Sequence, residues 1–281
     1  MNCLFCAGQE GRDIFWEGEI SVKRCPSCGH VFSSYQGEAD FSHYFPDDIS
    51  QGDHFWWREA HVRLYQDFRE KFMHGRSGRL LDVGCGLGYF LAGATADQKS
   101  SGWFLAGVET SRPACDYALR KLGLSDIYCG SITAAGYPDN SFDLVTLWDV
   151  IEHLPDPRPV LSAIRRALKD GGGVFLATPN INIQLPKARL KKFFKGGRPG
   201  HYLEARDHLH NYSPQTLRRL LEECGFKDCR FLQLPLISSV SGRRSRILSA
   251  IKELWRLFSW LIFFVSGGRL NFSNLYVIAY K

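Results

Sequence analysis

The sequence feature that most constrains the fold of this chain is an apolar run that ends in three glycines at alternate positions. Residues 80–88 read LLDVGCGLG, and a helix-like segment, 89–92, follows at once. This pattern predicts a buried parallel strand, a glycine turn and the start of a helix that packs back on the strand. Because glycine has no Cβ atom, the backbone can turn sharply there and approach a ligand closely. We therefore expect a ligand site at the end of this strand.

Strand-like and helix-like segments alternate after the turn. We expect further strands at 104–108, 127–129, 142–148, 174–177, 231–234 and 275–280, and helices at 113–122, 157–168 and 213–224. Such alternation predicts an α/β fold, a Rossmann-like, doubly wound, mostly parallel sheet of seven strands with helices on both faces. Ligands bind beyond the carboxyl ends of such strands. There the sequence places Asp82, Gly84, Glu109, Asp149 and Asn180.

Length and composition limit the number of domains, the kinds of partner and the cellular setting that this chain can have. The 281 residues, 44% of them hydrophobic, allow one large domain or a core domain with a small appendage. The net charge of +6 permits an acidic partner without requiring nucleic acid. We expect no signal peptide, because the first residues show no basic segment followed by an apolar core, and no apolar run reaches the ~20 residues of a membrane span. We expect a cytosolic protein, in which the nine cysteines are mostly reduced thiols or metal ligands.

Four cysteines lie in the first 36 residues, as two Cys-x-x-Cys pairs separated by 18 residues. They are Cys3 with Cys6 and Cys25 with Cys28. This spacing predicts a structural zinc site, because four thiolates fill the tetrahedron around the ion and close the site. Residues 1–36 are therefore interpreted as a zinc-ribbon-like segment, in which His30 is not needed as a ligand. Two disulfides or free cysteines are the alternatives.

Residues 37–77 form an aromatic connector. Apolar residues recur at roughly helical spacing from about residue 53 to residue 73, before glycines break the pattern. We expect this helix to cover one edge of the sheet and to tie the ribbon to the core. The alternative is that Tyr44, Trp56 or Arg58 lines the ligand pocket.

The carboxylate of Glu109 narrows the choice of ligand. Glu109 lies 23 residues after Gly86, at the tip of the second strand, where a carboxylate can accept both hydroxyl groups of a ribose. Three features argue against NAD: the glycine spacing is Gly-x-Gly-x-Gly, Asp82 would face a pyrophosphate, and no second nucleotide-binding half follows.

Several segments together resemble the class I S-adenosylmethionine-dependent methyltransferases. Residues 81–88 resemble motif I of that family, residues 147–157 (LWDVIEHLPDP) resemble the motif after its fourth strand, and residues 168–172 resemble the turn before its fifth. Residues 210–217 and 224–226 are similar to a branch in which a cysteine-rich zinc segment often precedes the core. The resemblance implies a methyltransferase domain at 78–281.

The resemblance also implies cofactor contacts. Asp82 would face the methionine ammonium group, Glu109 would bind the ribose, and Asp149 would lie beside the methionine end. Ser131 stands where the family usually has an acidic residue at the adenine amine. The full set of implied cofactor residues is Asp82, Gly84, Cys85, Gly86, Gly88, Glu109, Thr110, Ser131, Ile132, Asp149 and Val150.

Three histidines are candidates for a general base, which an oxygen nucleophile would require. His210 precedes the helix that starts at Ser213, and His208 would lie on the same side if the segment is extended. His153 follows the fourth strand on the substrate side. The alternatives are a loop that merely closes over the cofactor and, for His153, a local helix-forming role.

Two segments fall outside the shared core. Residues 184–203 carry six basic residues and are interpreted as a lid for a phosphate-bearing substrate, or as a solvated basic loop. Residues 243–267 begin with Arg243, Arg244 and Arg246 and continue as an amphipathic helix. That helix would lie on a membrane surface, cap the pocket or form a dimer contact.

The function expected from these features is methyl transfer from S-adenosylmethionine to a small molecule, a sugar or lipid-linked glycan intermediate among the candidates. The alternative is a zinc-ribbon nucleic-acid methyltransferase or binder. Residues 1–36 contain only Arg12, Lys23 and Arg24 as basic residues, which argues against that alternative.

Overall fold

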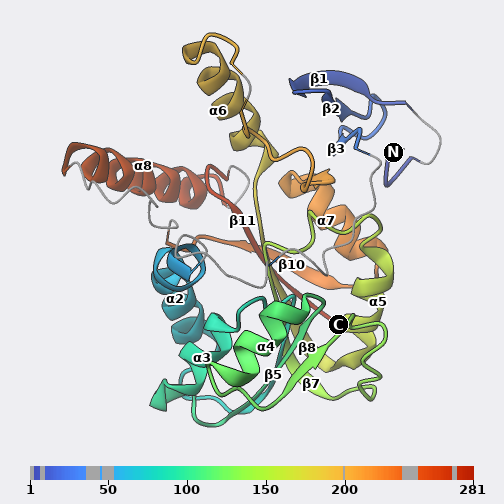
Figure 1. The fold of residues 1–281 in the computed structure, drawn as a ribbon, viewed down its shortest axis with the longest axis vertical. Helices are drawn as coiled ribbons and strands as arrows, with labels where there is room; N and C mark the ends of the chain where they lie inside the picture. The colour runs from blue at the N-terminus through green and yellow to red at the C-terminus, as the bar shows by residue number, and fades with distance from the viewer. Residues whose placement is uncertain are drawn as a thin grey trace.

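The computed structural model describes residues 3–6, 10–35, 45, 54–198, 200–235, 246–267 and 271–281. Figure 1 shows a central sheet covered by helices, with the N-terminal strands and two long helices around its upper end. The strands of this central sheet are β4 (Gly78–Val83), β5 (Trp103–Glu109), β6 (Ile127–Cys129), β7 (Phe142–Trp148), β8 (Leu168–Thr178), β10 (Lys227–Leu232) and β11 (Leu275–Tyr280).

The central sheet has the order β10-β11-β8-β7-β4-β5-β6. All neighbours from β8 to β6 pair in parallel, whereas β11 runs antiparallel to both β8 and β10. The predicted mostly parallel, seven-stranded Rossmann-like sheet is confirmed. The largest differences from the predicted boundaries are at two strand starts: β8 begins at Leu168, because residues 168–173 still pair with β7 across a bulge, and β10 begins at Lys227.

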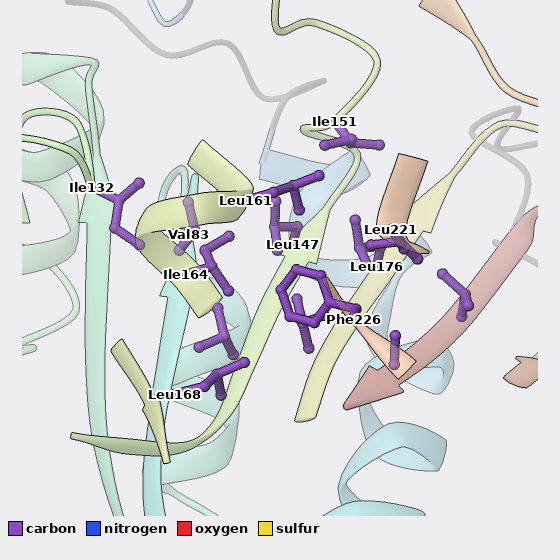
Figure 2. Packing of buried hydrophobic residues seen from close by; sticks show 14 of the residues in the cluster. Val83, Ile132, Leu147, Ile151, Leu161, Ile164, Leu168, Leu176, Leu221 and Phe226 are labelled. Atoms are coloured by element: carbon purple, nitrogen blue, oxygen red, sulfur yellow. The ribbon is translucent and has the colours of Figure 1, made fainter. Parts of the chain in front are cut away.

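Side chains alternate between the two faces of this sheet, as the two-residue period of a strand requires. Leu147 and Leu176 point to one face, where they pack against α5 (Arg158–Ala167) and α7 (Pro214–Glu223) (Figure 2). Trp148 and Phe175 point to the other face, against α2 (Val62–Phe72) and α3 (Tyr89–Thr95). The two layers hold the carboxyl edge of the sheet in a fixed geometry.

The connector is built as two short helices rather than one. A π-helix, η2 (Phe55–Ala60), ends at His61, and α2 follows it. The remaining helices are α4 (Arg112–Arg120), η3 (Gln98–Ser100), α6 (Ile181–Phe194) and α8 (Arg246–Val265). Tyr44, Arg243 and Arg244, which the sequence singled out, lie outside the described residues.

The N-terminal strands form a second sheet with a strand from the methyltransferase-like region. Its order is β1 (Arg12–Glu17), β2 (Ile20–Arg24), β3 (Val31–Ser33) and β9 (His210–Asn211), with antiparallel pairing throughout. The ribbon therefore shares its sheet with a segment about 180 residues further along the chain.

The basic segment 184–203 is not a loop over the pocket, so the lid interpretation is corrected. Its first eleven residues belong to α6, because Ile181, Leu185 and Ala188 make a helical stripe that packs on the ribbon. Arg189 and Lys192 donate hydrogen bonds to the backbone oxygens of Ile14 and Trp16 at 3.1 and 2.8 Å. This face of α6 is used inside the chain, to hold the ribbon.

Candidate active site

A cavity of about 460 Å³ opens at the carboxyl ends of β4, β5 and β7. Eleven of the residues implied by the sequence line it: Asp82, Gly84, Cys85, Gly86, Glu109, Thr110, Ser131, Ile132, Asp149, Val150 and His153. Strands that are distant in the sequence end at one edge of the sheet, and this brings the residues together.

The glycine turn forms the floor of this cavity. Gly84 and Gly86 have φ values of +70° and +53°, which glycine adopts without the strain of a Cβ atom. A Cβ atom at Gly84 would lie 2.6 Å from a methyl group of Val150. Gly88 does not line the cavity; a Cβ atom there would lie 2.7 Å from Leu124, so this glycine permits close packing of α3.

Glu109 is tied to the glycine turn by its carboxylate. One oxygen accepts a hydrogen bond from the backbone N–H of Gly86 and the other from that of Ser111, each at 2.8 Å. Burial raises the pKa of Glu109, while these backbone donors oppose the increase. The carboxylate is thus fixed against the turn at the tip of β5.

Asp82 is buried at the end of β4 and accepts a hydrogen bond of 2.7 Å from the hydroxyl of Thr146 on β7. Burial raises the pKa of Asp82 to about 8; the Thr146 bond opposes this, and the nearby charge of Glu109 adds to it. A cationic group entering the cavity would favour the carboxylate form of Asp82.

Asp149 takes a strained backbone conformation, with φ of +51°, immediately after β7. Its carboxylate lies 3.6 Å from Nε2 of His61, a fully buried side chain of the connector. The other ring nitrogen of His61 bonds the carbonyl oxygen of Trp56 at 2.7 Å. Because a carbonyl only accepts, Nδ1 carries a hydrogen, and His61 is held in a fixed orientation toward Asp149.

His153 lines the cavity together with its neighbours Leu154 and Pro155. Its Nδ1 donates to the carbonyl oxygen of Asp207 at 3.0 Å, so Nε2 is the basic nitrogen of the neutral ring. Burial lowers the pKa of His153 to about 4, with a contribution from His208. The ring is therefore neutral at pH 7, because burial disfavours its protonated form.

Two further side chains surround His153. The His208 ring stands edge-on to it, at 4.9 Å between centroids, and lies outside the cavity lining. Glu152 is buried and accepts a hydrogen bond from Thr178, while burial raises its pKa well above the usual range. The donor atoms of Glu152, His153 and His208 all lie within 4.8 Å of one another.

His210 lies elsewhere, and the expectation that it shares a side with His208 is wrong. Residues 204–208 form a turn, and only His210–Asn211 are extended. The ring of His210 is buried between Nε2 of His30, at 3.1 Å, and the carbonyl oxygen of Pro155, at 3.0 Å. Both of its nitrogens are bonded within the protein, so neither is available to act as a base; His210 joins the ribbon to the loop at Pro155.

The sequence analysis did not identify all of the residues that line the cavity. Phe45, Trp57 and Tyr65 line the cavity, whereas Trp56 and Arg58 do not. The aromatic richness of the connector was the available signal, but helical spacing alone does not show which aromatic side chains face the pocket.

The four N-terminal cysteines come together as their spacing predicts. The Sγ atoms of Cys3, Cys6, Cys25 and Cys28 all lie within 4.8 Å of one another, and none is in a disulfide. A tetrahedron with Zn–S distances of ~2.3 Å has sulfur atoms about 3.8 Å apart, so this cluster has the size of a zinc site.

Comparison with known proteins identifies the domain. A family model described as a methyltransferase domain matches residues 56–229, which is more than half of the chain. The chain belongs to this methyltransferase family. The match covers residues 56–77 of the connector and the strands that carry the cavity, so most of the cavity lining lies inside the methyltransferase domain.

Individual relatives agree with this family. Proteins called ubiquinone biosynthesis O-methyltransferase share 36% identity over 129 residues in Idiomarina loihiensis and 35% over 151 residues in Pseudomonas aeruginosa. These matches cover 44% and 49% of this chain, and 51% and 62% of the relatives' own length. This chain therefore spans only part of the relatives that it matches.

Solved structures share the fold of the methyltransferase domain. A SAM-dependent methyltransferase from Thermotoga maritima superimposes with a TM-score of 0.54 and 17% identity, covering 86% of this chain and 97% of the other. A phosphoethanolamine N-methyltransferase from Haemonchus contortus gives a TM-score of 0.51 and 22% identity, covering 78% of this chain and 52% of the other.

Proposed function

We propose that this protein transfers a methyl group from S-adenosylmethionine to a small-molecule acceptor. The observation that carries the proposal is the pair of buried carboxyl groups, Asp82 and Glu109, at the tips of two adjacent strands on either side of the glycine turn. Two carboxylates suit a ligand with an ammonium group and a ribose, and they would repel a pyrophosphate.

The residues present fit this cofactor. Glu109 would accept the two ribose hydroxyl groups, Asp82 would pair with the ammonium group, and the backbone at Gly84–Gly86 would lie against the chain between them. Ser131 and Ile132 would meet the adenine. When bound, the cofactor supplies an electrophilic methyl group on a sulfonium, so orientation provides much of the rate.

His153 is the residue we propose as general base, and His208 supports its ring. Nε2 of His153 would take the proton from an acceptor hydroxyl while its oxygen forms the new bond to the methyl carbon and the carbon–sulfur bond breaks. The carbonyl of Asp207 would stabilise the imidazolium, since Nδ1–H already donates to it.

The names of the relatives support a class of acceptor. Proteins named as O-methyltransferases of ubiquinone biosynthesis match the methyltransferase domain, which supports an oxygen acceptor on a small molecule. We propose a sugar or a lipid-linked glycan intermediate as such an acceptor. A nucleic-acid substrate is less well supported, because the ribbon turns one face to α6 and pairs its edge strand with β9.

We further propose that Cys3, Cys6, Cys25 and Cys28 bind one structural zinc ion. The clustering of four reduced thiols supports this assignment. The proposed role is structural. His30, two residues after Cys28, bonds His210, which in turn bonds the carbonyl oxygen of Pro155, so the cysteine cluster would hold this chain of contacts in place.

The pH dependence of cofactor binding tests the role of Asp82. Because the pKa of Asp82 is about 8, its carboxyl group is mostly protonated at pH 7. Pairing with an ammonium group requires the carboxylate, so binding should release a proton. We expect the apparent affinity to increase between pH 6 and pH 8, by up to about tenfold per pH unit. Calorimetry in buffers of different ionisation enthalpy measures both quantities, and Asp82→Asn should remove the pH dependence.

Transfer of a labelled methyl group tests the reaction and the base together. The protein is incubated with labelled cofactor and with aqueous and lipid fractions of a cell extract. We expect His153→Gln to slow transfer about 100-fold while leaving cofactor affinity within about twofold. His201→Gln, at an exposed histidine, is the matched control. An unchanged rate in His153→Gln would rule out this base, and the absence of labelled product in all fractions would contradict the proposed function.

A further inference from the structure

Helix α8 turns an apolar face to solvent. Six of its large apolar side chains are each at least 50% exposed: Leu254, Leu257, Trp260, Leu261, Phe264 and Val265. The described contacts of α8 with the rest of the protein centre on Phe272. The rings of Trp255 and Phe258 pack on the Phe272 ring, and the hydroxyl of Ser259 donates to the Phe272 carbonyl oxygen. An exposed apolar surface of this kind marks a binding surface.

Helix α6 ends in a second exposed apolar group. Leu190, Phe193 and Phe194 are 58%, 78% and 76% exposed. Basic residues lie near them in the sequence: residues 181–198 contain six lysines and arginines and no acidic residue, and two of the six, Arg189 and Lys192, bond the ribbon. The stripe of α6 that packs on the ribbon lies at Ile181, Leu185 and Ala188, so these aromatic residues are not needed to hold the ribbon.

The segment 271–273 contacts both helices, the start of α6 and the middle of α8. Asn180 caps the start of α6 through the backbone N–H of Asn182, and its amide nitrogen donates to the carbonyl oxygens of Asn271 and Ser273. Phe272, which lies between those two residues, is the contact of α8. Figure 1 shows both helices projecting beyond the body from this end, α6 upward and α8 to the side.

We propose that α6 and α8 together form a docking surface for an anionic lipid bilayer. Exposed tryptophan and phenylalanine side chains are suited to the interface between headgroups and acyl chains, and neighbouring lysines attract anionic headgroups. Among the described residues, none of the helices has the length and hydropathy of a membrane span. The excess of basic residues on α6 favours an anionic bilayer over a second copy of this basic chain.

The position of this surface connects it to the cavity. α6 starts three residues after β8, and α8 precedes β11, whose first residue, Leu275, pairs with Thr178 at the end of β8. Both helices therefore leave the carboxyl edge of the sheet, where the cavity opens. We infer that the methyl acceptor is amphipathic and reaches the cavity from the bilayer. This inference rests on the proposed function.

Vesicle binding tests the docking surface without cofactor or acceptor. The full chain is sedimented with vesicles of phosphatidylcholine alone and with vesicles that also contain phosphatidylglycerol, and binding is expected only to the second. We expect Trp260→Glu with Phe264→Glu to weaken binding about 100-fold, and Lys191→Glu with Lys195→Glu about tenfold. Phe104→Glu is the matched control, because Phe104 is exposed at the opposite, amino edge of the sheet.

Three outcomes would overturn the docking proposal. Failure to bind anionic vesicles, or binding that the α6 and α8 variants leave unchanged, excludes this surface. A concentration-dependent dimer that the Trp260→Glu, Phe264→Glu variant abolishes, without vesicle binding, identifies a second copy as the occupant. Calorimetry with S-adenosylmethionine in the absence of vesicles is expected to give equal affinities for all these variants. Vesicle binding without cofactor binding would refute the proposed function and leave the docking surface intact.

Discussion

Replacing Glu109 with alanine is expected to weaken S-adenosylmethionine binding about 100-fold. The carboxylate would accept two ribose hydroxyl groups, and hydrogen bonds to a charged group each contribute about 1.5–3 kcal/mol. The loss of one to two such bonds corresponds to about 3 kcal/mol, or roughly two decades in Kd. Calorimetry on wild type and variant gives the two affinities.

Two comparisons make the Glu109 result specific. Glu109→Gln keeps one acceptor oxygen but places an amide N–H₂ group near the backbone donors of Gly86 and Ser111, so its affinity should fall between those of wild type and Glu109→Ala. Glu223→Ala removes an exposed glutamate paired only with Arg219 and should bind as wild type does. Thermal unfolding of all variants checks that the fold is retained. Equal affinities for wild type and Glu109→Ala would disprove the assigned role of Glu109.

Loss of the proposed N-terminal zinc site is expected to have the largest effect on stability. Structural zinc sites in finger peptides bind with about 10–16 kcal/mol, and this binding energy is folding energy. We expect Cys25→Ala to abolish stoichiometric zinc and to destabilise the ribbon by about 5 kcal/mol or more. Zinc content by elemental analysis and hydrogen exchange of residues 10–35 report the two effects.

The effect of zinc loss should extend beyond the ribbon. β3 pairs with β9, and His30 contacts His210, which in turn holds the carbonyl of Pro155 at the cavity. We expect faster exchange in residues 153–157 and 210–211 of the Cys25→Ala variant. Cys224→Ser, at a half-buried thiol outside the cluster, is the matched control and should retain zinc. A disulfide between any of the four cysteines in freshly purified, metal-free protein would contradict the zinc assignment.

The sequence by itself determined the central sheet and the core of the site. Two-residue alternation, helix starts and glycine turns are local signals, and they located all seven strands of the central sheet. The parallel order then places the carboxyl ends at one edge, so Asp82, Glu109 and Asp149 had to converge there. The spacing of four cysteines likewise brought their thiols together, since each pair lies on one short turn.

Only the tertiary structure decided which surfaces meet across the length of the chain. α6 was interpreted as a lid, but its apolar stripe finds a partner in strands about 170 residues earlier. His210 has the same local pattern as a catalytic candidate, yet its ring bonds His30, 180 positions away. The π-helix η2 positions His61 beside Asp149, and the spacing of apolar residues in the sequence does not predict this helix. Such contacts depend on packing between distant segments. Local residue patterns do not show which distant surface a side chain will contact.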